Sequence, residues 1–360
     1  MNKKIGIVTG GGDCPGLNAV IRGVAKAAAM RGWETLGILG GYEGLLEPRQ
    51  FRVLDYNALS GLLTRGGTIL GTANRGRFSA KTGHGESRQL PQELLDATRA
   101  GMNSLGLSAL VSIGGDGSLT IAQQMHENGI PIVGVPKTID NDLDGTLMTF
   151  GFDSAVACAT DALDRLHTTA ESHNRVMVLE VMGRYAGWIA LYAGVAGGAD
   201  VILIPEIPFS YDSICAKIRE REAKGKKFTL VTVAEGACEK GGGFVTAGAQ
   251  EANREARLGG IGAVISEEIG RRSGKETRYC VLGHLQRGGS PTTFDRVLCS
   301  MFGAVAVELI DAGDFGKMVA FTGEQVGSVP IALAIGRLKT VPPQGSLTRT
   351  ARALGISLGD

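Results

Sequence analysis

The chain repeats one unit many times: a short apolar run, a glycine-rich turn and then a helical segment. Ile5–Thr9, for example, leads into Gly10-Gly-Gly-Asp-Cys-Pro-Gly and a helical pattern from about Leu17 to Met30. The runs are apolar throughout rather than alternating, which predicts parallel strands covered on both faces. The unit recurs at Ala109–Ile113, Ile132–Val135, Val176–Val181, Val201–Ile204, Thr229–Ala234 and Tyr279–Leu282. We therefore expect an α/β fold with doubly wound, mostly parallel, Rossmann-like sheets.

Composition narrows the class of protein. At 360 residues the chain is long enough for two domains, and a change of domain is expected near 149–153, before the helical stretch Ser154–His173. The net charge of +1 gives no general attraction to nucleic acid or to an anionic membrane. No apolar run approaches the roughly 18–20 residues of a membrane span, and the six cysteines show no zinc or CxxC spacing. A cytoplasmic enzyme is the expectation.

Two loops that follow apolar runs carry carboxylates. Gly114-Gly-Asp-Gly-Ser places Asp116 among residues with little side chain, where a hydrated Mg²⁺ carried on phosphates can reach it. Pro136-Lys-Thr-Ile-Asp-Asn-Asp-Leu places Asp140 and Asp142 two residues apart; if the loop is extended, both point to one side, and one can accept a hydroxyl proton. The combination indicates phosphoryl transfer. The simpler alternatives are an N-cap aspartate at Asp116 and an Asx turn at 140–142.

The first glycine loop, Gly10–Gly16, is less specific. Its backbone N–H groups and the helix that follows suit a phosphate. Its spacing matches neither the dinucleotide fingerprint nor the P-loop. Alone, it predicts a tight turn as readily as a binding site.

Basic and polar residues at strand edges add candidates for sugar-phosphate binding. Guanidinium groups bind phosphate monoesters with two hydrogen bonds, although a lone arginine at such a place is usually a surface residue. Glu235 follows an apolar run and can accept hydrogen bonds from sugar hydroxyls, and His284 is the one histidine of five in a similar context. The arginines at or near the edges of strand-like runs are Arg175, Arg184, Arg278 and Arg287.

Five motifs in order closely resemble the 6-phosphofructokinase family: Gly10-Gly-Gly-Asp-Cys-Pro-Gly-Leu-Asn, Gly114-Gly-Asp-Gly-Ser, Pro136-Lys-Thr-Ile-Asp-Asn-Asp, Glu180-Val-Met-Gly-Arg-Tyr and Gly283-His-Leu-Gln-Arg-Gly-Gly-Ser-Pro. The resemblance runs from about residue 3 to about residue 325. It implies the phosphofructokinase fold and transfer of a phosphoryl group from ATP, with Mg²⁺, to the 1-hydroxyl of fructose 6-phosphate in glycolysis. It also implies a donor-binding domain of residues 1–151 plus about 286–336, and a sugar-phosphate domain of residues 152–285 plus about 337–360.

The resemblance assigns catalytic roles position by position. Asp140 matches the base that deprotonates the 1-hydroxyl. Thr138 and Arg184 match the residues that stabilise the moving phosphoryl group, and Asp142 supports the metal and the geometry. Asp116 matches the carboxylate linked to Mg²⁺.

The resemblance also implies two sets of binding residues. Arg175 and Arg278 are similar to a pair that a neighbouring subunit contributes, which implies a homotetramer or homodimer. The donor site would comprise Gly12, Tyr42, Arg75, Arg77, Gly115, Asp116, Gly117 and Ser118. The sugar-phosphate site would comprise Thr138, Ile139, Asp140, Arg175, Met182, Gly183, Arg184, Glu235, Arg278, His284 and Arg287.

Two positions bear on the phosphoryl donor. Family members that use pyrophosphate resemble this chain at Lys137 but carry aspartate where it has Gly117. Members that use ATP have the glycine, and many lack the lysine. A carboxylate at 117 would occupy the space of the α-phosphate and repel it, so ATP is the expected donor. Many members also have an arginine where this chain has Thr72-Ala73-Asn74-Arg75, and Arg75 or Arg77 would take its place.

Three alternatives remain open from the sequence. One is a pyrophosphate-dependent fructose-6-phosphate 1-phosphotransferase. Another is a kinase of NAD or of a lipid, which shares the GGDG loop but lacks the pattern at Asp140, Asp142 and 283–291. The last is a sensor that binds nucleotide or sugar phosphate without turnover, against which the intact Asp140, Asp116 and Arg184 argue.

Overall fold

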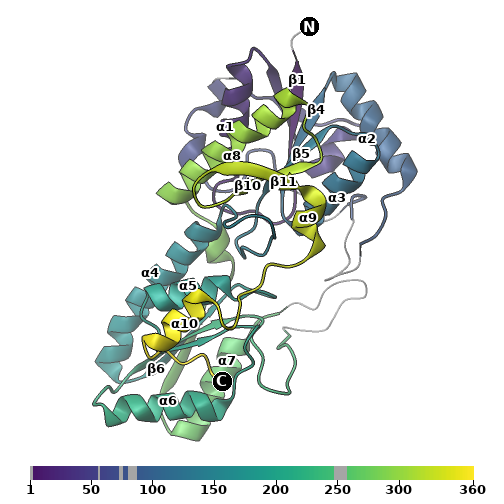
Figure 1. Cartoon of the computed structure of the whole chain (residues 1–360). Coiled ribbons are helices and arrows are strands. Elements are labelled where there is room, and N and C mark those ends of the chain that lie inside the picture. Colours follow the sequence, from purple (N-terminus) through teal and green to yellow (C-terminus); the bar gives the residue numbers. More distant parts are fainter. Residues whose placement is uncertain (1–2, 56, 73–75, 80–86, 247–257) are drawn as a thin grey trace. The chain divides into compact units, whose positions relative to one another are not determined.

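The computed structural model describes residues 3–55, 57–72, 76–79, 87–246 and 258–360. The chain divides into two compact units, shown in Figure 1. Unit 1 comprises Met1–Ile139, Leu143–Ser154 and Arg287–Leu338; unit 2 comprises Asp140–Asp142, Ala155–Gln286 and Lys339–Asp360. The three residues Asp140–Asp142 group with unit 2, and the chain passes into unit 2 again after Ser154, next to the change of domain expected near 149–153.

Unit 1 is built on a seven-stranded sheet of order β11-β10-β5-β4-β1-β2-β3. Its five inner strands are parallel, and the edge strands β11 and β3 are antiparallel to their neighbours. The strands are β1 (Lys4–Thr9), β2 (Glu34–Ile38), β3 (Phe51–Val53), β4 (Ala109–Gly114), β5 (Ile132–Pro136), β10 (Lys317–Phe321) and β11 (Val326–Pro330).

Helices cover both faces of this sheet. In Figure 1, α1 and α8 lie together on one side of the strands, and α2 and α3 lie on the other. Helix α9 packs against α3 and β11. The helices are α1 (Leu17–Ala29), α2 (Gln92–Leu105), α3 (Asp116–Glu127), α8 (Thr293–Ala312) and α9 (Ile331–Gly336), and short 3₁₀ turns lie at Gly41–Leu45, Asn57–Leu59 and Leu62–Thr64.

Unit 2 has a parallel four-stranded sheet of order β7-β8-β6-β9. Helix α5 packs on β7 and β8, and α7 packs on β6 and β9. Helix α4, which starts in unit 1, supplies most of its residues to unit 2. The strands are β6 (Val176–Val181), β7 (Val201–Leu203), β8 (Thr229–Ala234) and β9 (Thr277–Val281); the helices are α4 (Phe152–His173), α5 (Trp188–Ala196), α6 (Tyr211–Ala223), α7 (Ile261–Ser273) and α10 (Ser346–Ala353), with a 3₁₀ turn at Gly283–Arg287.

The predicted α/β architecture with two mostly parallel sheets is confirmed. Strands β4, β5, β6 and β8 are buried along their whole length, because helices cover both faces. The expected strand at Tyr279–Leu282 begins two residues earlier, at Thr277. It is the edge strand β9, which is largely exposed, so apolar content did not mark its start. Within the described ranges, no helix combines the length and the hydropathy that a membrane span requires.

Candidate active site

Three loops leave the sheet of unit 1 at the same edge. The parallel strands β1, β4 and β5 are neighbours, and Gly114 is paired with Pro136 at the ends of β4 and β5. Gly10 N donates to Ile113 O at 3.0 Å, and Lys137 N donates to Gly114 O at 3.0 Å. The two glycine loops and the loop that begins at Pro136 therefore start side by side, at the carboxyl edge where open α/β sheets bind ligands.

Close packing explains the glycines at the base of these loops. The Ser118 side chain is buried over Gly10 and Gly114. A Cβ added at either glycine would overlap the Ser118 side chain. The two loops are thus held against each other by a residue that belongs to one of them, and any larger side chain at Gly10 or Gly114 would push them apart.

Asp116 is the first residue of α3, and Gly115 is its N-cap. The alternative that Asp116 caps the helix is therefore wrong. Its carboxylate is half-buried at the helix N-terminus, where the helix dipole favours negative charge. Gly117 follows with open space: apart from its chain neighbours and the backbone of its own helix, no heavy atom lies within 4 Å of a Cβ added there.

The donor set suits magnesium bound through phosphates. Among the described residues, no group of three or more His, Cys, Asp and Glu side chains is placed to hold a metal ion. Mg²⁺ usually needs only one or two carboxylates, because phosphate oxygens and waters complete its octahedron. Asp116, between Gly115 and Gly117, could supply the single carboxylate that such a phosphate-bound Mg²⁺ needs.

Lys137 supports the first glycine loop. Its side chain is buried, with 5% exposure, and Nζ donates to Gly12 O at 2.5 Å. Nζ also lies 3.2 Å from the position that a Cβ on Gly11 would take. The ammonium group is thus beneath the Gly10–Gly16 loop, in contact with its main chain.

Arg287 lies at the same loop. Its Nη1 donates to Asp13 O at 3.2 Å, and a Cβ added at Gly12 would come within 2.6 Å of Nη1. Arg287 is a predicted sugar-phosphate residue, and Gly12 is a predicted donor residue. The structure brings these two residues together in unit 1.

Tyr42 and Arg77 take part in contacts that the sequence did not predict. The Tyr42 hydroxyl is buried, shares a 2.5 Å hydrogen bond with Ser112 Oγ and donates to Ser118 O at 3.2 Å. Burial raises the pKa of this phenol well above its usual range, so it stays neutral and supports the backbone of the GGDG loop. Arg77 forms an ion pair with Glu43, with Nη2 2.9 Å from Oε2.

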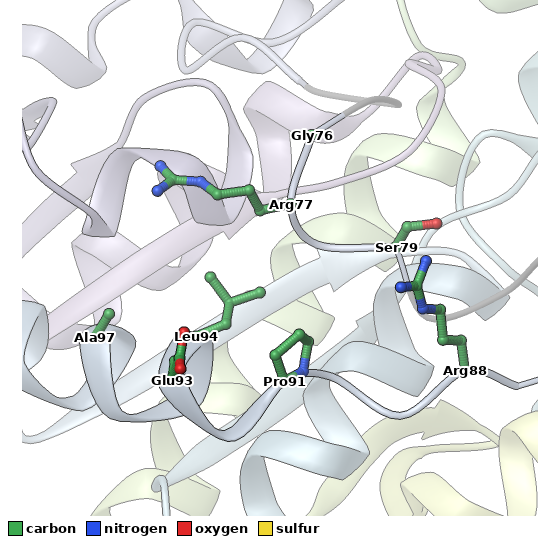
Figure 2. A pocket seen from close by; sticks show the side chains of 8 residues that line it. All are labelled: Gly76, Arg77, Ser79, Arg88, Pro91, Glu93, Leu94 and Ala97. Carbon is green, nitrogen blue, oxygen red and sulfur yellow. The ribbon is translucent and has the colours of Figure 1, made fainter.

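Arg77 also lines a pocket of about 540 Å³ beside the first turns of α2. Figure 2 shows Arg77 and Arg88 on separate segments of its rim. Its other lining residues are Gly76, Ser79, Pro91, Glu93, Leu94 and Ala97. Arg75, the second candidate for the missing arginine, lies outside the described residues.

The segment after β5 is held by a neighbouring stretch of chain. Thr149 Oγ1 donates to Thr138 O at 2.7 Å, and Lys137 and Phe150 form an isolated parallel β-bridge. Ile139 is buried beside them. The backbone of Thr138, a predicted catalytic residue, is thus fixed from the side by Thr149–Phe150.

That stretch is in turn anchored by Asp295, which the sequence analysis missed. The Asp295 carboxylate is fully buried and accepts hydrogen bonds from Gly151 N at 3.0 Å and from both Ser154 N (2.9 Å) and Ser154 Oγ. Thr292, the N-cap of α8, accepts from Asp295 N and donates to Asp153. Thr292-x-x-Asp295 is a helix-capping pattern, and that was the available signal.

We expect Asp295 to make the stability of unit 1 depend on pH. Burial, opposed by the hydrogen bonds from Ser154 and Gly151, raises the pKa of Asp295 from 3.8 to about 6. The folded chain therefore binds a proton at Asp295 more tightly than the unfolded chain does. This group's contribution to the free energy of unfolding falls as the pH rises from about 4 through 6, by about 1 kcal/mol between pH 5 and pH 7.

Denaturant unfolding at pH 5, 6 and 7 gives the free energy of unfolding of the wild type and of Asp295→Asn. The difference between the pH dependences of these two free energies is the contribution of Asp295. Asp311→Asn, which changes an exposed acid paired with Arg31, is the control and should keep the wild-type dependence. If Asp295→Asn also keeps it, the buried carboxyl does not titrate in this range.

In unit 2, the carboxyl ends of β6 and β8 bring four predicted residues together. Met182, Gly183 and Arg184 follow β6, and Glu235 follows β8. Gly236 N donates to Gly183 O at 3.1 Å, and a Cβ added at Gly236 would overlap the Arg184 carbonyl. The two strand ends therefore lie in backbone contact.

The end of β9 joins the same edge. Leu282 N donates to Glu180 O at 3.1 Å, which carries the chain alongside β6 into the turn Gly283–Arg287. His284 is exposed in that turn. The predicted sugar-phosphate residues of unit 2 that follow β6, β8 and β9 thus share one sheet edge.

Arg175 and Arg278 lie elsewhere. Arg175 precedes β6 and Arg278 is the second residue of β9, so both stand at the amino ends of these strands. They share Glu276, with Arg175 Nη2 at 2.8 Å and Arg278 Nη2 at 2.7 Å from Oε1. The pKa of Glu276 is lowered by the hydrogen bond from Arg175 and by both positive charges. A six-residue strand, about 20 Å long, separates this pair from Arg184 in the same chain.

Asp140 and Asp142 would point to one side only if their loop were extended. The structure shows that the loop is not extended throughout. Asn141 is buried and has a φ of +50°, in the left-handed region, which non-glycine residues seldom occupy. The alternation that would point Asp140 and Asp142 to one side is broken there. Lys339, which the sequence analysis also missed, contacts this loop.

The comparisons with known proteins agree with these observations. The phosphofructokinase family model matches residues 4–310. An ATP-dependent 6-phosphofructokinase of Chloroflexus aggregans is 52% identical over 358 residues, covering 99% of this chain and 98% of that protein. ATP-dependent 6-phosphofructokinase 1 of Synechocystis sp. is 52% identical over 362 residues, covering 99% of both.

Solved structures show the same fold. Phosphofructokinase from Saccharomyces cerevisiae matches with a TM-score of 0.81 and 30% identity over 93% of this chain and 45% of that one. A pyrophosphate-dependent phosphofructokinase from Nitrosospira multiformis has a TM-score of 0.81 over 99% of this chain and 93% of that one; its 22% identity supports the fold alone. From the family match and the full-length relatives, this chain belongs to the phosphofructokinase family.

Proposed function

We propose that this chain is an ATP-dependent 6-phosphofructokinase, which transfers the γ-phosphoryl group of ATP to the 1-hydroxyl of fructose 6-phosphate in glycolysis. The observation that carries this proposal is the 52% identity, over nearly the full length of both chains, to proteins of that name. The local geometry adds support: loops with phosphate-binding character and a loop with two carboxylates leave one sheet edge side by side.

The loops of unit 1 are the proposed donor site. The N–H groups of Gly12, Gly115 and Ser118 and the N-terminus of α3 suit the phosphates of ATP. Asp116 would hold Mg²⁺, which neutralises phosphate charge when it is bound. The open space at Gly117 leaves room for the α-phosphate. Tyr42 supports this loop from beneath, and Arg77 or Arg75 supplies positive charge at its rim.

Asp140 is the proposed general base. It takes the proton from the 1-hydroxyl as the oxygen attacks phosphorus. Thr138 donates a hydrogen bond to the transferring phosphoryl group, and the Arg184 guanidinium offsets its charge. Asp142 helps to set the geometry of the loop and of the metal.

The sugar phosphate is assigned to residues at the carboxyl edge of unit 2. Glu235 accepts hydrogen bonds from sugar hydroxyls, while the backbone of Met182 and Gly183 lies beside it. His284 belongs to the same edge. The family resemblance adds Ile139 and Arg287, which belong to unit 1. Arg287 also contacts Asp13.

We assign Arg175 and Arg278 to a neighbouring subunit's sugar-phosphate site, which makes the enzyme a homotetramer or homodimer. The supporting observation is their place at the amino ends of β6 and β9, at the opposite end of those strands from Arg184 of the same chain. The two guanidinium groups and Glu276 together carry a net positive charge, and guanidinium groups bind phosphate monoesters.

A pyrophosphate-dependent enzyme is the second candidate, and Lys137 is the feature that favours it. The Lys137 ammonium, however, donates to Gly12 O and lies under the loop. That position supports the glycine loop whatever the donor is. The open Gly117 favours ATP.

Turnover tests the function. Purified protein is mixed with ATP, Mg²⁺ and fructose 6-phosphate, and fructose 1,6-bisphosphate is detected through aldolase and a reductase. Steady formation of the bisphosphate supports the proposal. Binding of both substrates without turnover would instead favour the sensor.

A further inference from the structure

Lys339 joins the catalytic loop to the core of unit 2. Its backbone N donates to Asp142 O at 2.8 Å, and its Nζ donates to Asn141 Oδ1 at 2.8 Å. On its other side, the Lys339 carbonyl accepts from Trp188 Nε1 at 2.9 Å, and its Nζ lies 6.0 Å from the centre of the Trp188 ring. All four residues belong to unit 2.

We propose that Lys339 is a positioning residue for phosphoryl transfer: by holding Asn141 and Asp142, it fixes the direction in which Asp140 presents its carboxylate. This inference rests on the proposed function, because that function makes Asp140 the base. Lys339 itself need not touch substrate. Its effect is transmitted through the two residues that follow Asp140.

The backbone of Asn141 shows why the loop needs a second anchor. Its φ of +50° is unfavourable for a residue with a side chain, although Asn tolerates it better than most. Such a conformation persists only when its surroundings hold it. A hydrogen bond from an ammonium group is stronger than one from a neutral donor, and here it meets the side-chain oxygen of the strained residue. The bond to Asp142 O fixes the next peptide as well.

The segment that carries Lys339 is itself rigidly held. The Glu206 carboxylate accepts from Val341 N at 2.7 Å and from Gly187 N at 3.1 Å. Gly187 is the N-cap of α5, and Trp188 is the first residue of that helix. Glu206 therefore fastens the Lys339–Val341 segment to the start of α5. The segment after α9, which the sequence assigned only to the sugar-phosphate domain, thus supports the catalytic loop.

The Lys339→Met variant tests this inference. It keeps the length and apolar stem of the side chain and removes the ammonium group. We expect kcat to fall about 10²-fold, as a small misplacement of a reacting group can cause, while the KM values for ATP and fructose 6-phosphate stay within about 3-fold, since they report binding. The control, Arg352→Met, removes a cation from α10 in the same C-terminal segment, where Arg352 pairs with Asp360. Its kcat should stay within about 2-fold.

A double-mutant cycle identifies the route of the effect. Asn141→Gly keeps a residue that accepts a positive φ but removes the acceptor of the Lys339 bond. If Lys339 acts through Asn141, Lys339→Met/Asn141→Gly should be no slower than the slower single variant. Independent, multiplying losses would overturn the inference. Trp188→Phe removes the indole N–H that donates to Lys339 O and keeps an aromatic ring at this position. It should give a smaller loss of kcat and serves if Lys339→Met fails to fold.

Hydrogen exchange separates failure of this inference from failure of the proposed function. Amide exchange in a peptide spanning residues 137–143 should quicken in Lys339→Met and stay unchanged in Arg352→Met, whether or not the protein is a kinase. Unchanged exchange, or unchanged kcat in an active enzyme, would overturn the role of Lys339. The wild type could show no turnover while the loop of Lys339→Met exchanges faster than that of the wild type. That result would reject the proposed function alone, and Lys339 would still be the residue that anchors the loop.

Discussion

Asp140→Ser should lower kcat by about 10²–10⁴-fold and change the KM for fructose 6-phosphate little. A general base acts on the transition state, so its loss appears in the rate of the chemical step. Serine keeps a small polar side chain in the loop but cannot accept the proton at neutral pH. Steady-state rates with saturating ATP and varied fructose 6-phosphate measure both constants.

Asp144→Ser is the matched control. Asp144 follows Asp140 by four residues and forms an ion pair with Arg337 in unit 1. We expect this variant to keep kcat within about 3-fold, because Asp144 pairs with the exposed Arg337 and with the backbone of its own turn, and an ion pair to an exposed arginine contributes little. More than a tenth of wild-type turnover in Asp140→Ser would contradict the assignment of Asp140 as the base.

Gly117→Asp should reduce kcat/KM for ATP at least about 100-fold. The space around Gly117 is open, so the new side chain fits without displacing neighbours. An acidic residue in the first turn of α3 is also favourable for the helix. The loss would therefore come from placing a carboxylate where the α-phosphate binds, a repulsion of several kcal/mol at short range in a partly desolvated site, on the order of the Coulomb energy at an effective dielectric constant of 20.

Gly117→Ala separates charge from bulk. The added methyl group enters the same open space, and we expect kcat/KM for ATP within about 5-fold of wild type and an unchanged melting temperature. Equal losses in the alanine and aspartate variants would show that any side chain blocks the site. Unimpaired use of ATP by Gly117→Asp would contradict the proposed donor site.

The parts of the fold that sequence could predict are those governed by local pattern. Strands β6 and β8 begin and end where their apolar runs do, because both faces are buried. The edge strand β9 carries exposed and charged residues, so its apolar content gave the wrong start. Four strands of unit 1, β2, β3, β10 and β11, were not predicted. Strands β3 and β11 are antiparallel edges, which need no continuous apolar run. Strands β2 and β10 are inner parallel strands that were missed despite their buried residues.

The candidate site divides in the same way. The sequence motifs predicted Asp116, Gly117 and the 136–142 loop as site residues. In these segments the local sequence contains both the glycines that form the turn and the carboxylates proposed to act on the substrates. Lys339 and Asp295 depend on contacts across 198 and 141 residues of chain, and no local pattern predicts such partners. The sequence left open whether the 140–142 loop is extended or forms an Asx turn. The left-handed conformation of Asn141 occurs together with a hydrogen bond from Lys339, a tertiary contact that the local sequence does not reveal.

The most direct measurement is a set of initial rates with ATP, ADP and pyrophosphate in parallel, each with Mg²⁺ and fructose 6-phosphate. The open Gly117 and the full-length identity to ATP-dependent relatives predict a kcat/KM for ATP at least about 10²-fold above that for pyrophosphate. This ratio corresponds to about 3 kcal/mol of difference in transition-state binding. Rates that are as high with pyrophosphate as with ATP, or higher, would contradict the assignment of ATP as the donor.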